Sequence, residues 1–179
     1  VVILLLGALL RVYGLGSRSL WADEFCTWRV SRMPLGDSLR WGPELTKPPL
    51  YQFGLRAITD DPRPAEWVLR SPACAAGVLI VLAVFALARV GGSITTGLAA
   101  AVLCACNLLQ IHYSQEARAY SMLVLSATIS TLLWHRLVDQ SHEATQPRSH
   151  EATTGESRRL FMARSLWAGY ILAAVLMFH

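Results

Sequence analysis

The sequence has little charge, and this scarcity excludes several classes of protein. Asp, Glu, Lys and Arg make up 16% of its 179 residues, whereas about 25% is usual in a soluble domain. Lys47 is the only lysine, and the arginines are scattered rather than gathered in a stripe. Nucleic-acid binding is therefore not indicated. The apolar residues, 54% of the chain, occur in long blocks, which is typical of an integral membrane protein.

The sequence also lacks a recognisable cysteine framework. Cys104 and Cys106 lie within one apolar block, Cys74 lies near the start of another, and Cys26 is isolated. This spacing matches neither a zinc site nor a disulfide pattern. We interpret the cysteines of the apolar blocks as small packing residues.

The apolar blocks predict an all-α, polytopic transmembrane bundle with about five visible spans. The predicted spans are 1–13, 71–88, 94–111, 119–134 and a segment that begins at residue 166. A signal peptide is the alternative for the first block, but no small-residue cleavage site follows it. We expect a fragment in which the first and last spans are incomplete. The arginines near the span ends are expected to reach the lipid headgroups; they are Arg11, Arg70, Arg89, Arg118 and Arg136.

A long first loop, residues 14–66, separates the first two spans and holds seven of the 12 acidic residues. Aromatic and aliphatic residues between 21 and 33 recur at helical spacing, which predicts a short helix at the membrane interface. Two prolines at 48 and 49 must break any helix before them. A second short helix is predicted at 50–58, and a turn at 60–64.

The polar segment 136–164 is predicted to be a flexible linker before a further span at 165–179. It contains the pentapeptide Ser-His-Glu-Ala-Thr twice, at 141–145 and 149–153. Metal binding by the two His-Glu pairs is the alternative, but a duplicated linker is the more common origin of such a repeat. The module that precedes it is expected to comprise residues 1–135.

Charge alone does not orient the bundle. Ten basic residues are predicted on the same side of the membrane as the first loop, and six on the other side. The positive-inside rule would therefore place the loop in the cytoplasm. That rule is weak for long loops. We therefore set it aside and expect the loop to be extracytoplasmic.

Adjacent acids in the first loop are the first candidates for chemistry. Asp23 and Glu24 would point about 100° apart on a helix, so one can face a reaction centre while the other makes a structural contact. A carboxylate beside Trp21 or Phe25 would have a raised pKa and be a better general base. Alternatively, the two acids only complement the dipole at the start of a helix.

The remaining candidates are suited to binding a phosphorylated or sugar-bearing ligand. Lys47, on a segment stiffened by prolines, could stabilise a phosphate, although it could also be an ordinary surface lysine. Glu116 and Arg118 do not share a helix face, so Arg118 could bind phosphate and Glu116 a sugar, a metal or Lys47. The substrate-binding candidates also include four hydrogen-bonding residues: Tyr51, Tyr113, Gln115 and Tyr120.

Five short motifs follow the first apolar block in this order: Arg-Val-Tyr-Gly-Leu-Gly, Ser-Leu-Trp-Ala-Asp-Glu, Lys-Pro-Pro-Leu-Tyr, Trp-Val-Leu-Arg-Ser-Pro and Tyr-Ser-Gln-Glu-Ala-Arg-Ala-Tyr. In this order they resemble the N-terminal part of bacterial GT-C-type glycosyltransferases, which include protein O-mannosyltransferases and the lipid A aminoarabinose transferase. The resemblance covers roughly residues 1–135. It implies a multi-pass enzyme of the bacterial inner membrane. Such an enzyme transfers a sugar from a polyprenyl-phosphate donor to a lipid, glycan or protein acceptor on the extracytoplasmic face, with inversion.

The resemblance also assigns roles to residues. Asp23 matches the first-loop acid proposed as catalytic base, Glu24 completes the acidic pair, and Glu116 matches the acid of the second extracytoplasmic loop. Lys47 is associated with the lipid phosphate. Thr46 stands where some relatives carry an acid that helps to hold a metal, so we assign no metal ligand; a divalent metal is the one cofactor left open. Because the family's later spans are missing, we expect this stretch alone to be inactive.

Two other functional classes remain open. A transporter or lipid flippase usually needs ionisable groups at mid-membrane depth, and the predicted spans have none at their centres. A non-catalytic membrane subunit would tolerate replacement of Asp23 and Glu116. The sugar and the acceptor do not follow from the sequence.

Overall fold

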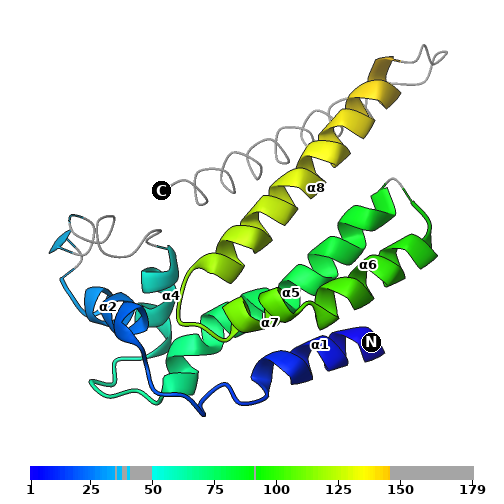
Figure 1. Cartoon of the computed structure of the whole chain (residues 1–179). Coiled ribbons are helices and arrows are strands. Elements are labelled where there is room, and N and C mark those ends of the chain that lie inside the picture. The colour runs from blue at the N-terminus through cyan, green and yellow to red at the C-terminus, as the bar shows by residue number, and fades with distance from the viewer. Residues whose placement is uncertain (35, 38–39, 41–49, 91, 146–179) are drawn as a thin grey trace.

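The computed structural model describes residues 1–34, 36–37, 40, 50–90 and 92–145. This part of the chain is helical and contains no β-strand (Figure 1), as the sequence predicts. Its seven helices are α1 (Val2–Val12), α2 (Ala22–Ser31), α4 (Leu50–Ile58), α5 (Glu66–Val90), α6 (Ile94–Cys106), α7 (Leu108–Ser114) and α8 (Tyr120–Thr145).

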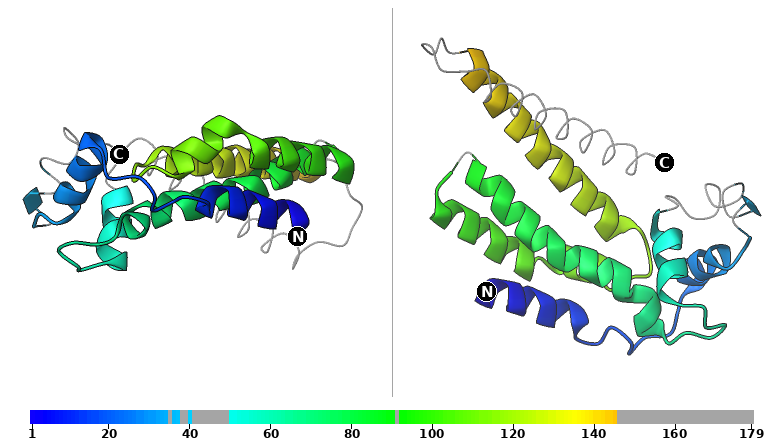
Figure 2. Two further views of the ribbon diagram at one scale, coloured as in Figure 1. Left: turned by 60° about the horizontal axis from the view of Figure 1, so that its bottom comes forward. Right: turned by 180° about the vertical axis from the view of Figure 1, so that it is seen from behind.

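Helix α5 is the centre of the bundle and packs against α1, α6, α7 and α8. Figure 2 shows α8 along one side of α5, with α6 and α1 along the other. Large apolar side chains remain exposed on the outer faces, among them Leu9, Leu103 and Ile129. Exposed apolar faces on helices of this kind are suited to contact with lipid.

The described residues contain two helices that could span a membrane, or three if one bent pair is a single span, so the predicted count of about five is not confirmed. Helix α5 and the first part of α8, Tyr120–Val138, are long and apolar enough to cross a membrane, and α6 with α7 would make a third span. Helix α1 is apolar but shorter, and the predicted fifth span lies outside the described residues. Helix α8 continues to Thr145, so the first part of the predicted linker, 136–145, is helical.

The predicted third span is not one straight helix, because Asn107 separates α6 from α7 and the two are bent by 60°. The Asn107 side chain accepts a hydrogen bond from the Gln110 amide, at 3.0 Å, and so caps α7. The last carbonyls of a helix have no partner one full turn further along the same helix. At the end of α6, the Arg11 guanidinium donates to two such carbonyls, on Ala105 at 3.2 Å and Cys104 at 3.3 Å.

Arg11 is therefore buried, with 0% of its surface exposed. The sequence predicts that it reaches the headgroups, and this prediction is wrong. A guanidinium placed between apolar helices needs hydrogen-bond acceptors, and the end of α6 supplies them.

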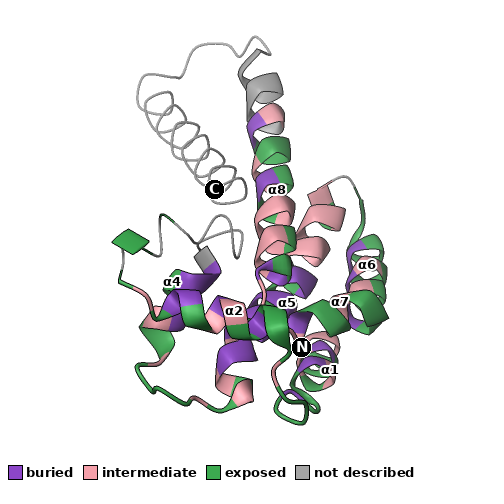
Figure 3. Cartoon of the chain, turned by 60° about the vertical axis from the view of Figure 1, so that its left-hand side comes forward, coloured by how far each residue is buried: buried purple, intermediate pink, exposed green. Residues whose placement is uncertain are grey.

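Helices α2 and α4 lie together at one end of the bundle (Figure 1). Both predicted short helices are confirmed, and α4 has the predicted bounds. Figure 3 shows buried residues concentrated where these helices meet the start of α5. The apolar cluster at this junction consists of Tyr51, Leu55, Leu69, Ala73, Ala117 and Ala119. This cluster joins the first loop to the segment between α7 and α8, and so brings the candidate residues of both together.

Candidate functional site

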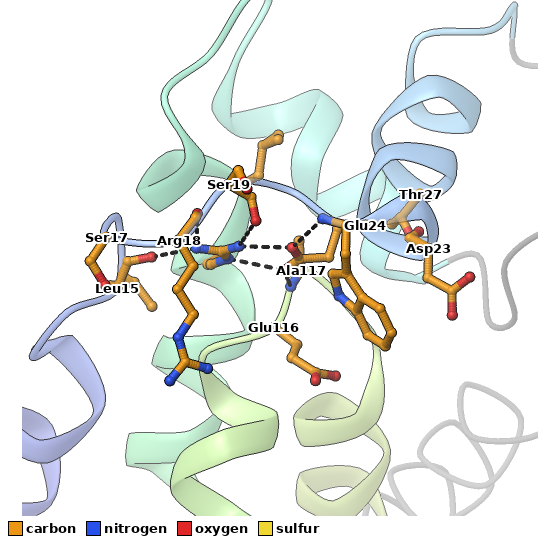
Figure 4. A network of polar contacts seen from close by, with 12 residues as sticks. Leu15, Ser17, Arg18, Ser19, Asp23, Glu24, Thr27, Glu116 and Ala117 are labelled. Atoms are coloured by element: carbon orange, nitrogen blue, oxygen red, sulfur yellow. Dashed lines mark hydrogen bonds and ion pairs between the residues drawn. The ribbon is translucent and has the colours of Figure 1, made fainter.

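A buried carboxylate organises the junction between the first loop and the bundle. Glu24, 1% exposed, accepts hydrogen bonds from Arg70 Nε at 2.9 Å and Arg70 Nη2 at 2.8 Å. It also accepts one from the Ala117 amide at 2.7 Å and one from the Trp21 amide at 3.4 Å (Figure 4). One side chain thus fixes α2, α5 and the α7–α8 connection relative to one another.

Arg70 extends the same network into the connection between α1 and α2. Its Nη1 donates to the carbonyls of Leu15 and Arg18, both at 2.9 Å, and its Nη2 lies 3.3 Å from the Ser19 carbonyl. Arg70 is 4% exposed, so the prediction that it reaches the headgroups is wrong. Its charge is instead neutralised by Glu24 inside the protein.

The pKa of Glu24 reflects two opposed influences. Burial alone would raise it, but the hydrogen bonds from Arg70 and the Ala117 amide, with the positive charge of Arg70, hold the pKa below its usual value. Glu24 is consequently an ionised anchor at neutral pH. A carboxylate with this many donors has little capacity to take a proton from a substrate.

Asp23, the residue before Glu24, has a different environment. Its side chain is 53% exposed and its Oδ2 lies 3.1 Å from Nη1 of Arg118. Figure 4 shows its carboxylate pointing away from the Glu24–Arg70 network. The helical geometry thus separates the adjacent acids into one buried and one accessible carboxylate.

An aromatic side chain lies against Arg118, the other partner of this ion pair. The Arg118 guanidinium lies 5.5 Å from the ring centre of Tyr120 and 3.3 Å from its hydroxyl. The rings of Tyr113 and Tyr120 are 4.9 Å apart, and both residues are partly exposed. An exposed aromatic pair beside a carboxylate and a cation is suited to contact with a sugar ring.

Glu116 precedes Ala117 and Arg118 follows it, and the two charged residues contact different partners. Its Oε1 is 3.1 Å from His112 Nε2, and 13% of its side chain is exposed. Burial raises the pKa of Glu116, and the nearby charge of Glu24 adds to this, whereas positive charge on His112 opposes it. Among the candidate acids of the described chain, Glu116 is the one whose surroundings raise its pKa.

Glu116 also lines a cleft of about 360 Å³ between the α1–α2 connection and α7. The cleft is lined by Gly14, Leu15, Arg18, Ser19, Trp21, Glu24, Arg70, His112, Gln115 and Glu116. Asp23 and Arg118 are not part of its lining.

Two of the predicted substrate-binding residues have structural partners. Tyr51 is buried and its hydroxyl donates to the Leu69 carbonyl at 2.6 Å. The Gln115 amide nitrogen lies 2.9 Å from the Tyr13 carbonyl and 3.2 Å from the carbonyls of Leu10 and Arg11. Gln115 therefore fixes the end of α1 to the end of α7, and Tyr51 fixes α4 to α5.

Lys47 lies outside the described residues, so its predicted role is not addressed by the geometry. Within the described ranges, no group of three or more His, Cys, Asp or Glu residues could hold a metal ion. Sequence reasoning missed Arg18 and the structural role of Arg70. An arginine one turn into an apolar helix that starts with Glu66 is a signal that could have indicated a buried ion pair for Arg70; Arg18 has no such signal.

Comparison with known families identifies the kind of protein to which this site belongs. The family model described as dolichyl-phosphate-mannose-protein mannosyltransferase matches residues 46–145, more than half of the chain. The chain belongs to this family. It is thus a membrane glycosyltransferase of the mannosyltransferase type, as the motif resemblance predicts. The match includes Glu116 and Arg118, while Asp23 and Glu24 precede it. Comparisons with curated proteins and with solved structures found no match.

Proposed function

We propose that this mannosyltransferase-family protein transfers a sugar from a polyprenyl-phosphate donor to an acceptor hydroxyl. The reaction takes place at the extracytoplasmic face of the bacterial inner membrane, in a multi-pass protein. The acceptor is a lipid, a glycan or a protein. Family membership, the apolar helices and a cluster of charged groups at one end of the bundle support this function.

The proposed chemistry is a single inverting displacement. The acceptor oxygen attacks the anomeric carbon, and Asp23 takes the proton from that oxygen. The bond between the anomeric carbon and the phosphate oxygen breaks, and the phosphate leaves with the electron pair. Phosphate is stable as an anion, so cationic side chains are sufficient to assist its departure. Lys47 and Arg118 provide this charge.

The observation that carries the proposal is the partly exposed ion pair between Asp23 and Arg118, 3.1 Å apart at the end of the bundle. In-line displacement requires the attacking oxygen and the leaving phosphate on opposite sides of the anomeric carbon. A sugar that reacts here must therefore separate the two side chains. When they part, Arg118 becomes available to the phosphate and Asp23 becomes a free base.

The other candidates support this centre. Glu24 acts as a positioning residue, because its bonds to Trp21 and Ala117 hold the segments that carry Asp23 and Arg118. Glu116 accepts hydrogen bonds from sugar hydroxyls. The pair Tyr113 and Tyr120 presents an aromatic surface to the sugar ring.

The test is sugar transfer from labelled polyprenyl-phosphate donors in membranes that contain the full-length protein. Asp23→Asn is expected to abolish transfer, by about 10³-fold or more for loss of a general base, while donor binding is retained. Asp60→Asn is the matched control, because Asp60 is another exposed acid of the same loop. Equal transfer by wild type and Asp23→Asn would move the base to Glu116. Absence of transfer with every donor would reject the proposed activity in favour of a non-catalytic subunit.

A further inference from the structure

Arg18 is a cation of the cleft that the proposed chemistry does not use. It lies on the connection between α1 and α2, exposed, and lines the cleft together with Trp21 and Glu116. Figure 4 shows the side chains of Arg18 and Glu116 pointing to the same side of the Glu24–Arg70 network. Of the ion pairs formed among the described residues, none includes Arg18.

The other charges of the cleft already have partners. Glu24 is paired with Arg70, and Glu116 contacts His112. Arg18 is thus the guanidinium of the described cleft that has no acidic partner. A guanidinium presents several donors in a fork that matches the oxygens of a phosphate.

The cleft has the size and the lining of a small polar ligand site. Its volume of about 360 Å³ falls within the range of about 300–1,000 Å³ for small-molecule sites. The Trp21 side chain is about half exposed there, and an indole face suits the apolar face of a sugar ring. Helix α1 ends at Val12, shortly before Arg18, so the cleft lies at the end of an apolar helix, where lipid phosphates are found.

We propose that this cleft receives the phosphate-bearing headgroup of the lipid-linked sugar, with the Arg18 guanidinium on the phosphate. Trp21 then lies against the sugar ring and Glu116 accepts hydrogen bonds from its hydroxyls. This inference rests on the proposed function and adds to it a site where the donor binds first. Because Asp23 and Arg118 lie outside the cleft, the headgroup then moves to them for the reaction. Arg118 has a different part, because Asp23 and Tyr120 engage it until the sugar enters.

The side chain of Arg18 can be replaced without breaking the network behind it. Arg70 donates to the backbone carbonyl of residue 18, and this carbonyl remains in any substitution. Arg18→Gln should therefore fold. Arg63→Gln is the matched control, because Arg63 is an exposed arginine of the same loop that is outside the cleft.

Binding of labelled polyprenyl phosphate, without a sugar, is measured on the purified protein in phosphatidylcholine nanodiscs. Loss of one charge-assisted hydrogen bond is expected to weaken binding about tenfold or more in Arg18→Gln. Arg18→Lys should restore part of the affinity, and Arg63→Gln should bind as wild type does. Unchanged affinity in Arg18→Gln, or an equal loss in both glutamine variants, would overturn the proposal.

Two competitors identify the source of the phosphate. A soluble glycosyl phosphate is expected to displace the labelled lipid from wild type more effectively than from Arg18→Gln. Displacement by phosphatidylglycerol that depends on Arg18 would make the cleft a site for bilayer phospholipid, and would overturn its assignment to the donor. Because binding needs no turnover, loss of binding in Arg18→Gln would support the cleft even if Asp23→Asn proved fully active.

Discussion

Glu24 and Arg70 form a buried ion pair that closes at 2.8 Å and joins the first loop to the central helix of the bundle. The same carboxylate accepts hydrogen bonds from the backbone amides of Trp21 and Ala117. Trp21 is close in sequence to Asp23, and Ala117 lies between Glu116 and Arg118. The pair therefore sets the distance between the two segments that carry the candidate residues. Its effect on the reaction is indirect, through the placement of other groups.

Removal of the Glu24 charge is expected to destabilise the protein strongly. In Glu24→Gln the guanidinium of Arg70 stays buried without a counter-charge, and breaking a buried pair in this way costs about 3–5 kcal/mol. Thermal unfolding in detergent should show a large decrease in the midpoint temperature. Asp60→Asn, an exposed change in the same loop, is the control. An unchanged midpoint in Glu24→Gln would show that the pair does not hold the junction.

The stability from Glu24 should also depend on pH. Its pKa in the folded protein is lower than in the unfolded chain, so the stabilisation is present above the unfolded value and is lost as the pH falls through the folded value. The midpoint temperature of wild type should therefore decrease as the pH is lowered below about 4.5, the ordinary glutamate pKa. Glu24→Gln should show a smaller decrease over the same range, and parallel curves would contradict this assignment.

Loss of the Arg118 charge should slow transfer with little effect on folding. The pair with Asp23 is open to solvent on the side of Asp23, and ion pairs that solvent reaches contribute at most about 1 kcal/mol to stability. Arg118→Gln is expected to lower kcat by about 10²-fold, as loss of an electrostatic donor in a transition state does. Arg63→Gln should leave kcat unchanged. A defect confined to KM would instead make Arg118 a residue for ground-state binding.

Patterns along the chain predict much of the fold. The spacing of apolar residues and the two prolines predict α2 and α4, and the uncharged blocks predict α5 and the apolar part of α8. These features are local, because helix formation and burial along one helix face depend on residues a few positions apart. The resemblance of the motifs likewise predicts the family.

The sequence does not predict which charged residues are buried. Arg11 contacts the end of α6, 94 residues away, and Arg70 contacts Glu24, 46 residues away. Both arginines stand near span ends, and a local pattern cannot distinguish a side chain that reaches the headgroups from one that turns inward. The break at Asn107 is not predicted for the same reason, because the carbonyls of Cys104 and Ala105 accept hydrogen bonds from Arg11, which belongs to a distant helix. In the candidate site, the sequence predicts that the two adjacent acids of the first loop point apart, but only the packing of α2 shows which of them is buried.

Close packing of α5 against α7 depends on Gly77. A Cβ atom at this position would lie 2.5 Å from Cβ of Ser114 and 3.0 Å from Nε of Arg11. Gly77→Ala is therefore expected to destabilise the protein by about 1–3 kcal/mol, because neither helix can move without disturbing the other contacts of the bundle. Gly54→Ala is the control, since its new Cβ would make an ordinary contact at 3.8 Å. Thermal unfolding of both variants in the same detergent tests this, and equal midpoints would refute it.

The contact between His112 and Glu116 should appear in the pH dependence of transfer. If ionised Glu116 is needed to bind the sugar, kcat/KM should fall on the acidic side at a pH above the usual glutamate range, because burial raises the pKa of this carboxyl.

Positive charge on His112 opposes that rise, so its removal should raise the pKa of Glu116 further. In His112→Gln the acidic limb of the kcat/KM profile is therefore expected at higher pH than in wild type. Glu116→Gln should lower kcat/KM and remove the part of the limb that Glu116 causes, leaving only the ionisation of the proposed base, Asp23. A limb that stays in place in both variants would belong to another group, and Asp23 would then be the first to replace.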